Sequence, residues 1–167
     1  CFRVWIGAES GSQKIIDAMD RRVKVEQVRD MIQLSKAQGL QTGTFIMVGY
    51  PGETEEDIEA TISHLKLSDP DLYTITVAYP IKGTPLYAET ESIFIDPQPW
   101  ESSTDRQIDF HRTYSRRYYE YAIRRVYNEV AYYKKRKSQV AGFSSLTKHK
   151  LKSLFAKGGM LWERTFH

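Results

Sequence analysis

Hydrophobic residues in the first eighty positions switch between the period of a strand and the period of a helix. Three apolar runs rich in β-branched and aromatic residues predict strands over 2–8, 42–48 and 72–78. Apolar positions at helical spacing predict a helix around Ile15, Ile16 and Met19, another from Val25 to a stop at Gly39, and a third over 54–67. Strands that alternate with helices predict a parallel sheet with crossover connections.

The carboxyl ends of the predicted strands are polar or glycine-rich. They read Glu9-Ser10-Gly11-Ser12, Gly49-Tyr50-Pro51-Gly52-Glu53 and Ala78-Tyr79-Pro80. Such ends meet at one edge of a parallel sheet, where α/β proteins collect their ligands. Thr54 and Asp57 also fit a capping box at a helix start, so the loop before Thr54 has a purely structural interpretation too.

A proline-rich stretch divides the chain, because two prolines exclude a continued helix or a central strand. We therefore separate residues 1–95, a linker at 96–103, and a basic, tyrosine-rich helical extension at 104–167. Apolar positions in the extension predict one helix from about Thr104 to Lys137 and a second from Phe143 to about Lys157. Their apolar stripes are Ile108, His111, Tyr118, Ala122, Val126 and Val130 on the first, and Phe143, Leu146, Leu151, Leu154 and Phe155 on the second.

Charge supports this division. The net charge of the 167 residues is only +3. Residues 1–105 hold 9 Lys and Arg against 17 Asp and Glu, a charge of −8, while residues 106–167 hold 15 against 4, a charge of +11. The single cysteine, Cys1, argues against a disulfide scaffold and for the reducing cytoplasm. The four histidines are too scattered to predict a metal site.

Four motifs, taken in order, resemble the last three strands of a radical S-adenosylmethionine (radical SAM) barrel. They are Gly7-Ala8-Glu9-Ser10-Gly11-Ser12 with the following Ala18-Met19-Asp20-Arg21, Val48 to Thr54, Ala78-Tyr79-Pro80, and Gly83-Thr84-Pro85-Leu86-Tyr87. The resemblance covers about residues 2–91 and is closest to the subgroup with an N-terminal cobalamin-binding domain. It implies an α/β fold: part of a TIM-like (β/α) barrel followed by an α-helical C-terminal extension.

The resemblance also implies cofactor-binding residues. Glu9 matches a polar residue that accepts hydrogen bonds from the ribose hydroxyls, and Arg21 a basic residue that pairs with the methionine carboxylate. Met47 lies where the family packs an apolar residue against adenine, Ala78 where strand-end backbone meets the adenine edge, and Gly49 where the backbone approaches closely. Some relatives have an Asp two residues before Met47 where this chain has Phe45, which implies fewer protein acceptors for the diol.

Each of these residues has a structural alternative. Glu9 is also suited to a helix start, where a carboxylate interacts favourably with the helix dipole. Arg21 belongs to a charged Asp20-Arg21-Arg22 turn that water can solvate. Met47 fits ordinary core packing.

The family reaction needs a four-iron four-sulfur cluster held by a Cys-x3-Cys-x2-Cys loop, and one cysteine cannot supply three ligands. We therefore expect the chain to be the carboxyl-terminal piece of a longer protein, whether cut out, processed or encoded by a split gene. The alternative is a complete small protein of three strands with a helical tail. In an intact parent, the resemblance implies reductive cleavage of S-adenosylmethionine to a 5′-deoxyadenosyl radical, followed by hydrogen abstraction from a substrate that the sequence does not identify. With cobalamin, methyl transfer or rearrangement would follow.

Three interpretations remain open for the basic extension. Tyr rings and Arg stems can pack on the barrel with their polar ends in water, or residues 106–157 can contact RNA or an anionic membrane surface. In the last two cases the chain would be a non-catalytic binding module, the alternative to the enzyme. The strand beginning at Phe2 would be an open edge that the missing N-terminal half of the barrel, the long helix or a second copy could cover.

Overall fold

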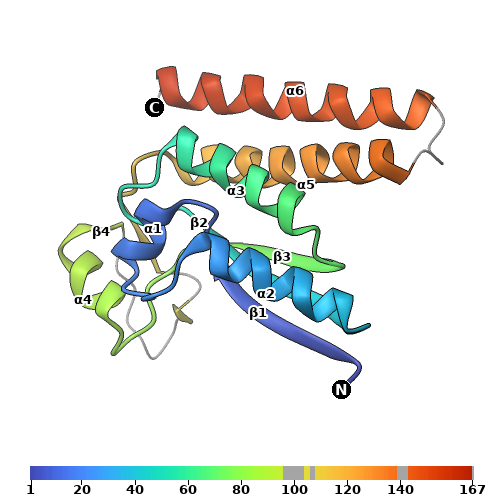
Figure 1. The fold of residues 1–167 in the computed structure, drawn as a ribbon. Helices are drawn as coiled ribbons and strands as arrows, with labels where there is room; N and C mark the ends of the chain where they lie inside the picture. The colour runs from blue at the N-terminus through green and yellow to red at the C-terminus, as the bar shows by residue number, and fades with distance from the viewer. Residues whose placement is uncertain (96–103, 106–107, 139–142, 167) are drawn as a thin grey trace.

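The computed structural model describes residues 1–95, 104–105, 108–138 and 143–166 (Figure 1). Strands β1 (Arg3–Glu9), β2 (Gln41–Val48) and β3 (Leu72–Val77) form a parallel sheet in that order. Helices α1 (Gln13–Ala18) and α2 (Val25–Ala37) connect β1 to β2, and α3 (Glu55–Ser68) connects β2 to β3. The predicted order of strands and helices, and with it the partial barrel, is confirmed.

A smaller set of elements follows the sheet. Helix α4 (Pro85–Thr90) leads into the 3₁₀ helix η1 (Glu91–Ile93), and β4 (Phe94–Ile95) pairs antiparallel with β5 (Asp109–Phe110). The predicted linker at 96–103 lies outside the described residues. Helices α5 (Arg116–Ser138) and α6 (Phe143–Phe166) complete the fold.

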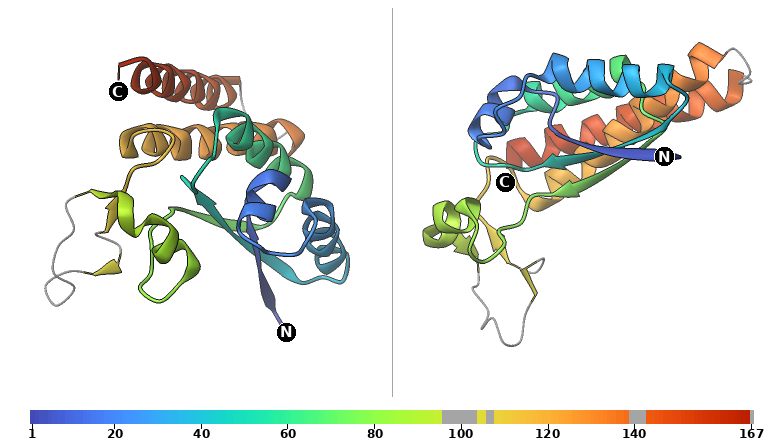
Figure 2. Two further views of the ribbon diagram at one scale, coloured as in Figure 1. Left: turned by 90° about the vertical axis from the view of Figure 1, so that its left-hand side faces the viewer. Right: turned by 60° about the horizontal axis from the view of Figure 1, so that its bottom comes forward.

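Only one face of the sheet is covered by helices (Figure 2). Alternate residues of β2, among them Thr44, Ile46 and Val48, are buried beneath that layer with Ala8 of β1. On the other face Trp5 and Phe45 are exposed and their rings stack 4.7 Å apart. In a closed barrel this second face would be the interior, where ligands bind.

Local side-chain chemistry fixes the loop between β1 and α1 on α3. Ser12 Oγ donates to Asp57 Oδ1 at 2.6 Å, and the Gly11 amide donates to Thr61 Oγ1 at 2.9 Å. The Thr54 amide donates to Asp57 Oδ2 at 2.8 Å, so the expected capping box is present. Burial alone would raise the pKa of Asp57, but hydrogen bonds from Lys14, Ser12 and Thr54 hold it below its usual range.

The start predicted for the long helix is wrong. Helix α5 begins at Arg116 rather than near Thr104. Phe110 pairs with Phe94 in the β4–β5 ladder, so the chain is extended there, and Ile108 and His111 lie outside the helix. Ser115 then caps the helix, because its Oγ accepts from the Tyr118 amide at 3.1 Å.

Helix α6 also differs from the prediction. It continues through Gly158 and Gly159 to Phe166 and lies on the side of α5 away from the sheet (Figure 1). Its buried residues are Ser153, Ala156, Met160 and Glu163, whereas the predicted apolar residues Leu151, Leu154 and Phe155 are exposed.

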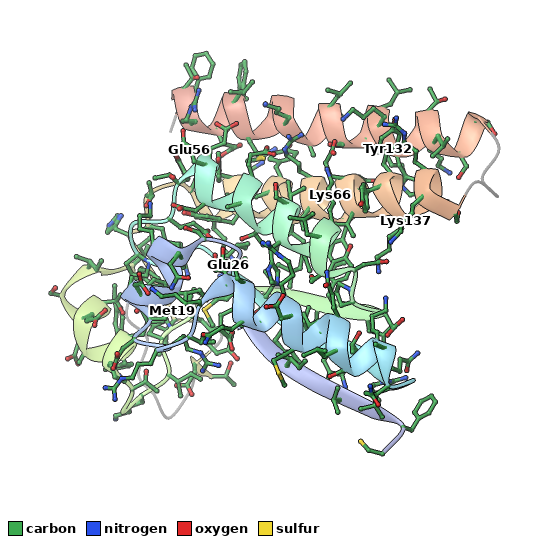
Figure 3. All side chains as sticks on the ribbon, in the orientation of Figure 1. Met19, Glu26, Glu56, Lys66, Tyr132 and Lys137 are labelled. Carbon is green, nitrogen blue, oxygen red and sulfur yellow. The ribbon has the colours of Figure 1, made fainter. Side chains whose placement is uncertain are left out.

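Opposite charges join the extension to the rest of the chain. Lys134 and Lys137 of α5 lie 3.3 and 3.2 Å from the carboxylate of Asp69, and Arg164 of α6 donates to Glu55 at 2.8 Å. Lys66 points from α3 toward α5 (Figure 3) and donates to Glu129 at 2.9 Å. Part of the basic surface expected to meet RNA or lipid is therefore engaged within the protein.

The edge of β1 is not where α5 packs. Helix α5 contacts α3, α6 and β3, and β3 is at the other end of the sheet order. Phe2 is exposed beside the free edge of β1. Val4 and Ile6 are half-buried on the covered face rather than open at the edge.

Candidate functional site at the carboxyl ends of the strands

Glu9 sits at an irregular point of β1. The register with β2 shifts between Gly7 and Glu9, and Glu9 has a φ of 58°. The left-handed region is unfavourable for a residue with a Cβ atom, and such backbone strain is concentrated at ligand sites. The bulge turns the Glu9 side chain at the strand end, as bulges beside functional sites do.

Arg21 comes from the turn after α1 and meets Glu9. Its Nη2 lies 3.4 Å from Glu9 Oε1. The residues on either side of it, Asp20 and Arg22, also have positive φ values of 48° and 53°. Of the four non-glycine residues with positive φ in the described part of the chain, one is Glu9 of this ion pair and two are the neighbours of Arg21.

Gly7 leaves room for the pair. A Cβ atom there would lie 2.6 Å from Glu9 Oε1 and 3.0 Å from Arg21 Nη2. A groove of about 600 Å³ lies between β1 and α2, lined by Arg21 with Ile6, Gly7 and Met31 but not by Glu9. The Arg21 side chain is 45% exposed and the Glu9 side chain 19%, so a ligand can reach the pair.

Gly49 and Ala78 meet a residue of the extension, Arg112. Arg112 Nη2 donates to the Ala78 carbonyl at 2.6 Å, and the Ala78 amide donates to the Val48 carbonyl at 2.7 Å. A Cβ atom at Gly49, whose φ is 80°, would lie 3.2 Å from Arg112 Cδ. The Arg112 side chain is only 3% exposed and also pairs with Asp109. Arg112 thus holds the ends of β2 and β3 together.

Met47 lies between these two groups. It lies on β2, the central strand, opposite Thr76 of β3, and is half-buried on the uncovered face. The structure therefore brings Glu9 and Arg21 together, brings Gly49 and Ala78 against Arg112, and leaves Met47 between the two groups.

Glu53 is a buried carboxyl at the same edge. One of its oxygens accepts from the Gly49 amide, and the other has no partner among the described residues. Burial raises the pKa of Glu53 to about 8, although the Gly49 amide opposes the rise. The carboxyl is therefore protonated at neutral pH and shapes the loop as a neutral group.

Sequence reasoning missed Arg112 and gave no role of their own to Glu53 and Gly7. Arg112 is 34 residues from Ala78 and looked like one of many basic residues of the extension. Glu53 was named only as part of a strand end, and Gly7 only as part of a motif. The one local signal was the Gly-x-x-x-Glu spacing from Gly49 to Glu53, which permits the loop hydrogen bond that the structure shows.

No group of three or more His, Cys, Asp or Glu side chains is placed to hold a metal ion within the described ranges. Cys1 is exposed. None of the helices in these ranges is both long and apolar enough to cross a bilayer.

Comparison with known proteins shows what the amino-terminal part of the chain is similar to. The model of the radical SAM superfamily matches residues 1–65. An uncharacterized methyltransferase of Pyrococcus horikoshii is 38% identical over 88 residues, which are 52% of this chain and 19% of the relative. A tRNA-2-methylthio-N(6)-dimethylallyladenosine synthase of Clostridium botulinum is 36% identical over 88 residues (51% and 19%), and one of Fervidobacterium nodosum is 34% identical over 83 residues (48% and 19%).

The chain spans about a fifth of the length of these curated relatives. The matched family region contains β1, β2 and most of α3, and with them Glu9, Arg21, Met47 and Gly49. The resemblance to radical SAM enzymes that the motifs predict is therefore confirmed over residues 1–65, the amino-terminal α/β part of the chain.

Proposed function

We propose that the carboxyl ends of β1, β2 and β3 form part of the S-adenosylmethionine site of an enzyme that transfers a methyl or methylthio group. The ion pair of Glu9 and Arg21, held by a strained backbone at a strand end, carries this proposal. The printed names of the relatives, a methyltransferase and methylthio-group synthases, support the class of reaction.

The residues present fit S-adenosylmethionine. Its ribose diol needs an acceptor and its carboxylate needs a cation, and the Glu9 carboxylate and the Arg21 guanidinium are such groups side by side. Gly7 keeps both accessible because it has no Cβ atom. In the free protein Glu9 and Arg21 pair with each other at 3.4 Å. On binding, the cofactor would replace this contact with shorter hydrogen bonds from its ribose to Glu9 and from Arg21 to its carboxylate.

The far end of the cofactor would lie toward β2 and β3. Met47 would pack against adenine, and the strand-end backbone of Gly49 and Ala78 would border it. The Ala78 carbonyl already accepts from Arg112, but a carbonyl oxygen has a second lone pair for the adenine amino group. Arg112 keeps this edge in place and so prepares the site before the ligand arrives.

The residues of this chain do not fit the iron–sulfur cluster that the superfamily uses. The sequence contains one cysteine, and three thiolates are needed to leave one iron open to the cofactor. In a protein that held both groups, cluster and cofactor would supply a 5′-deoxyadenosyl radical by reductive cleavage. In our proposal the cluster ligands, and a cobalamin-binding part if the reaction is cobalamin-dependent, are provided by residues that are not in this sequence.

Glu9→Gln tests the proposal in a protein that carries this chain together with the cluster-binding cysteines. Calorimetric titration should show that S-adenosylmethionine binds about 1–3 kcal/mol more weakly, because Gln has no charge and replaces one acceptor oxygen of the carboxylate with a donor. Asp30→Asn is the matched control, because Asp30 lines the same groove outside the ion pair. If both variants bind the cofactor as the parent does, Glu9 is only a structural residue and the proposed site is wrong.

A further inference from the structure

Helix α6 places its polar and small residues inward and its large apolar residues outward. Toward α5 it buries Ser153, Ala156, Met160 and Glu163. On the outside, Leu151 is 61%, Phe155 74% and Trp162 60% exposed. This is the reverse of the usual orientation of an amphipathic helix on a globular protein.

Specific contacts hold α6 in this rotation. Glu129 of α5 accepts from Ser153 at 2.7 Å and from Lys150 at 2.9 Å. Burial alone would raise the pKa of Glu129, but these bonds and the one from Lys66 lower it to about 2, so the carboxylate stays charged. Turning α6 to bury its apolar face would take Ser153 and Lys150 away from this charge and leave it only Lys66 of α3, which is unfavourable for a buried carboxylate.

The other end of α6 is fixed in the same way. Glu163 accepts from Ser115 Oγ at 2.9 Å and pairs with Arg117 at 3.4 Å. At Gly159 a Cβ atom would lie 2.6 Å from the ring of Tyr121, so the two helices approach closely there. The outward apolar face is therefore a built feature rather than a loosely packed one.

The exposed face forms one continuous stripe. Its members recur every three or four residues or at twice that spacing: Leu151, Leu154, Phe155, Leu161, Trp162 and Phe166. Trp162 and Phe166 are neighbours, with ring centroids 4.3 Å apart. Soluble proteins rarely expose a contiguous apolar surface of this kind, so the stripe is expected to contact a binding partner.

The charge around the stripe has one sign. Helix α6 carries Lys148, Lys152 and Lys157, together with Lys150 and Arg164, which pair with Glu129 and Glu55, and its one acid, Glu163, is buried against α5. Between α5 and α6 a groove of about 500 Å³ is lined by Arg124 and Lys152 together with Leu151 and Phe155. Basic and apolar side chains lining one groove match the phosphate and the acyl chain of a lipid.

We propose that α6 lays this stripe into the surface of an anionic lipid bilayer, with the lysines reaching the headgroup phosphates. An apolar face between basic flanks is the pattern of helices that lie in a membrane interface. A second copy of the chain would bring two basic rims together, and RNA, whose bases can stack on aromatic rings, would leave the leucines of the stripe uncovered. This inference is independent of the proposed cofactor site.

Vesicle flotation of the full chain tests the inference. Phosphatidylcholine vesicles with about one third phosphatidylglycerol should carry the protein, and phosphatidylcholine vesicles should not. The double variant Leu151→Ser with Phe155→Ser should bind these vesicles at least about tenfold more weakly. Leu34→Ser with Leu67→Ser is the matched control, because these leucines are exposed on α2 and α3, and it should bind like the parent.

Tryptophan fluorescence shows which part of the protein contacts the vesicles. Trp162→Phe should remove a blue shift of the tryptophan emission that anionic vesicles cause, whereas Trp5→Phe should leave it. Three results would overturn the inference: no binding to anionic vesicles, binding that the stripe variant leaves unchanged, or a stripe variant that loses only RNA binding or only self-association. The helical circular dichroism of each variant shows whether it is folded.

Discussion

The Glu53 carboxyl accepts a hydrogen bond from the Gly49 amide through one oxygen, while its other oxygen is buried without a partner among the described residues. The pKa of about 8 lies well above the ordinary value of 4.5. The folded protein therefore keeps a proton on Glu53 that the unfolded chain loses above pH 4.5.

This difference makes stability depend on pH. The contribution of the raised pKa is complete below about 4.5 and is lost as the pH rises through about 8, because the folded state binds more protons than the unfolded state in between. His64, whose pKa burial lowers to about 4, has the opposite slope, but its effect ends near pH 6.5. Between pH 6.5 and 8 the free energy of unfolding should fall by about 1 kcal/mol per pH unit.

Urea unfolding at several pH values measures this slope. Glu53→Gln should make the free energy of unfolding less dependent on pH. Glu56→Gln, which changes an exposed acid in the first turn of α3, should leave the pH dependence unchanged. An unchanged slope in Glu53→Gln would show that another group carries the proton.

Two neighbouring glycines of α6 should respond in opposite directions to alanine. Gly158 has open space where a Cβ atom would go, so Gly158→Ala should stabilise the helix by up to about 1 kcal/mol. Gly159 faces the ring of Tyr121, so Gly159→Ala should destabilise the protein by about 1–3 kcal/mol. Thermal unfolding of the two variants compares them directly, and equal shifts would mean that α6 does not pack on α5 through this side.

How far the sequence predicts this protein depends on the range of each signal. The three strands and the capping box of Thr54 and Asp57 follow from residues close in sequence, and they were predicted correctly. The start of α5 was predicted wrongly, because Phe110 pairs with Phe94 in a β-ladder, and hydrophobic periodicity does not reveal a pairing between distant residues. The rotation of α6 depends on Glu129, which looks like an ordinary surface acid until its three partners are placed around it.

The candidate site shows the same limit. Glu9 and Arg21 were found through family motifs, and their meeting at 3.4 Å is what the structure adds. Arg112 lies outside those motifs and acts through the Ala78 carbonyl, so no pattern near it in the sequence indicates its place.

The free edge of β1 should make the chain self-associate. An unpaired edge with exposed Phe2 and Trp5 can recruit a second strand. Light scattering at micromolar concentration should show species larger than a monomer, and Trp5→Lys should reduce them more than Leu34→Lys does. A monomer whose β1 amides are protected from hydrogen exchange would mean that the edge is covered.

Anaerobic reconstitution of this chain with iron and sulfide should yield no stoichiometric four-iron cluster. The reason is the single cysteine, which cannot provide three ligands. Absorbance at about 400 nm, together with iron and sulfide analysis, gives the answer. A stable cluster with four irons per chain would require ligands that this account does not include.

The most direct test of the cofactor site compares two ligands on one variant. 5′-Methylthioadenosine keeps the adenine and the ribose diol of S-adenosylmethionine but lacks its carboxylate. In a protein that carries this chain and the cluster-binding cysteines, Arg21→Gln should weaken S-adenosylmethionine binding by about tenfold or more and leave 5′-methylthioadenosine binding unchanged. Arg22→Gln, which changes the exposed neighbour paired with Asp20, should affect neither ligand. An equal loss for both ligands, or no loss for S-adenosylmethionine, would contradict the site.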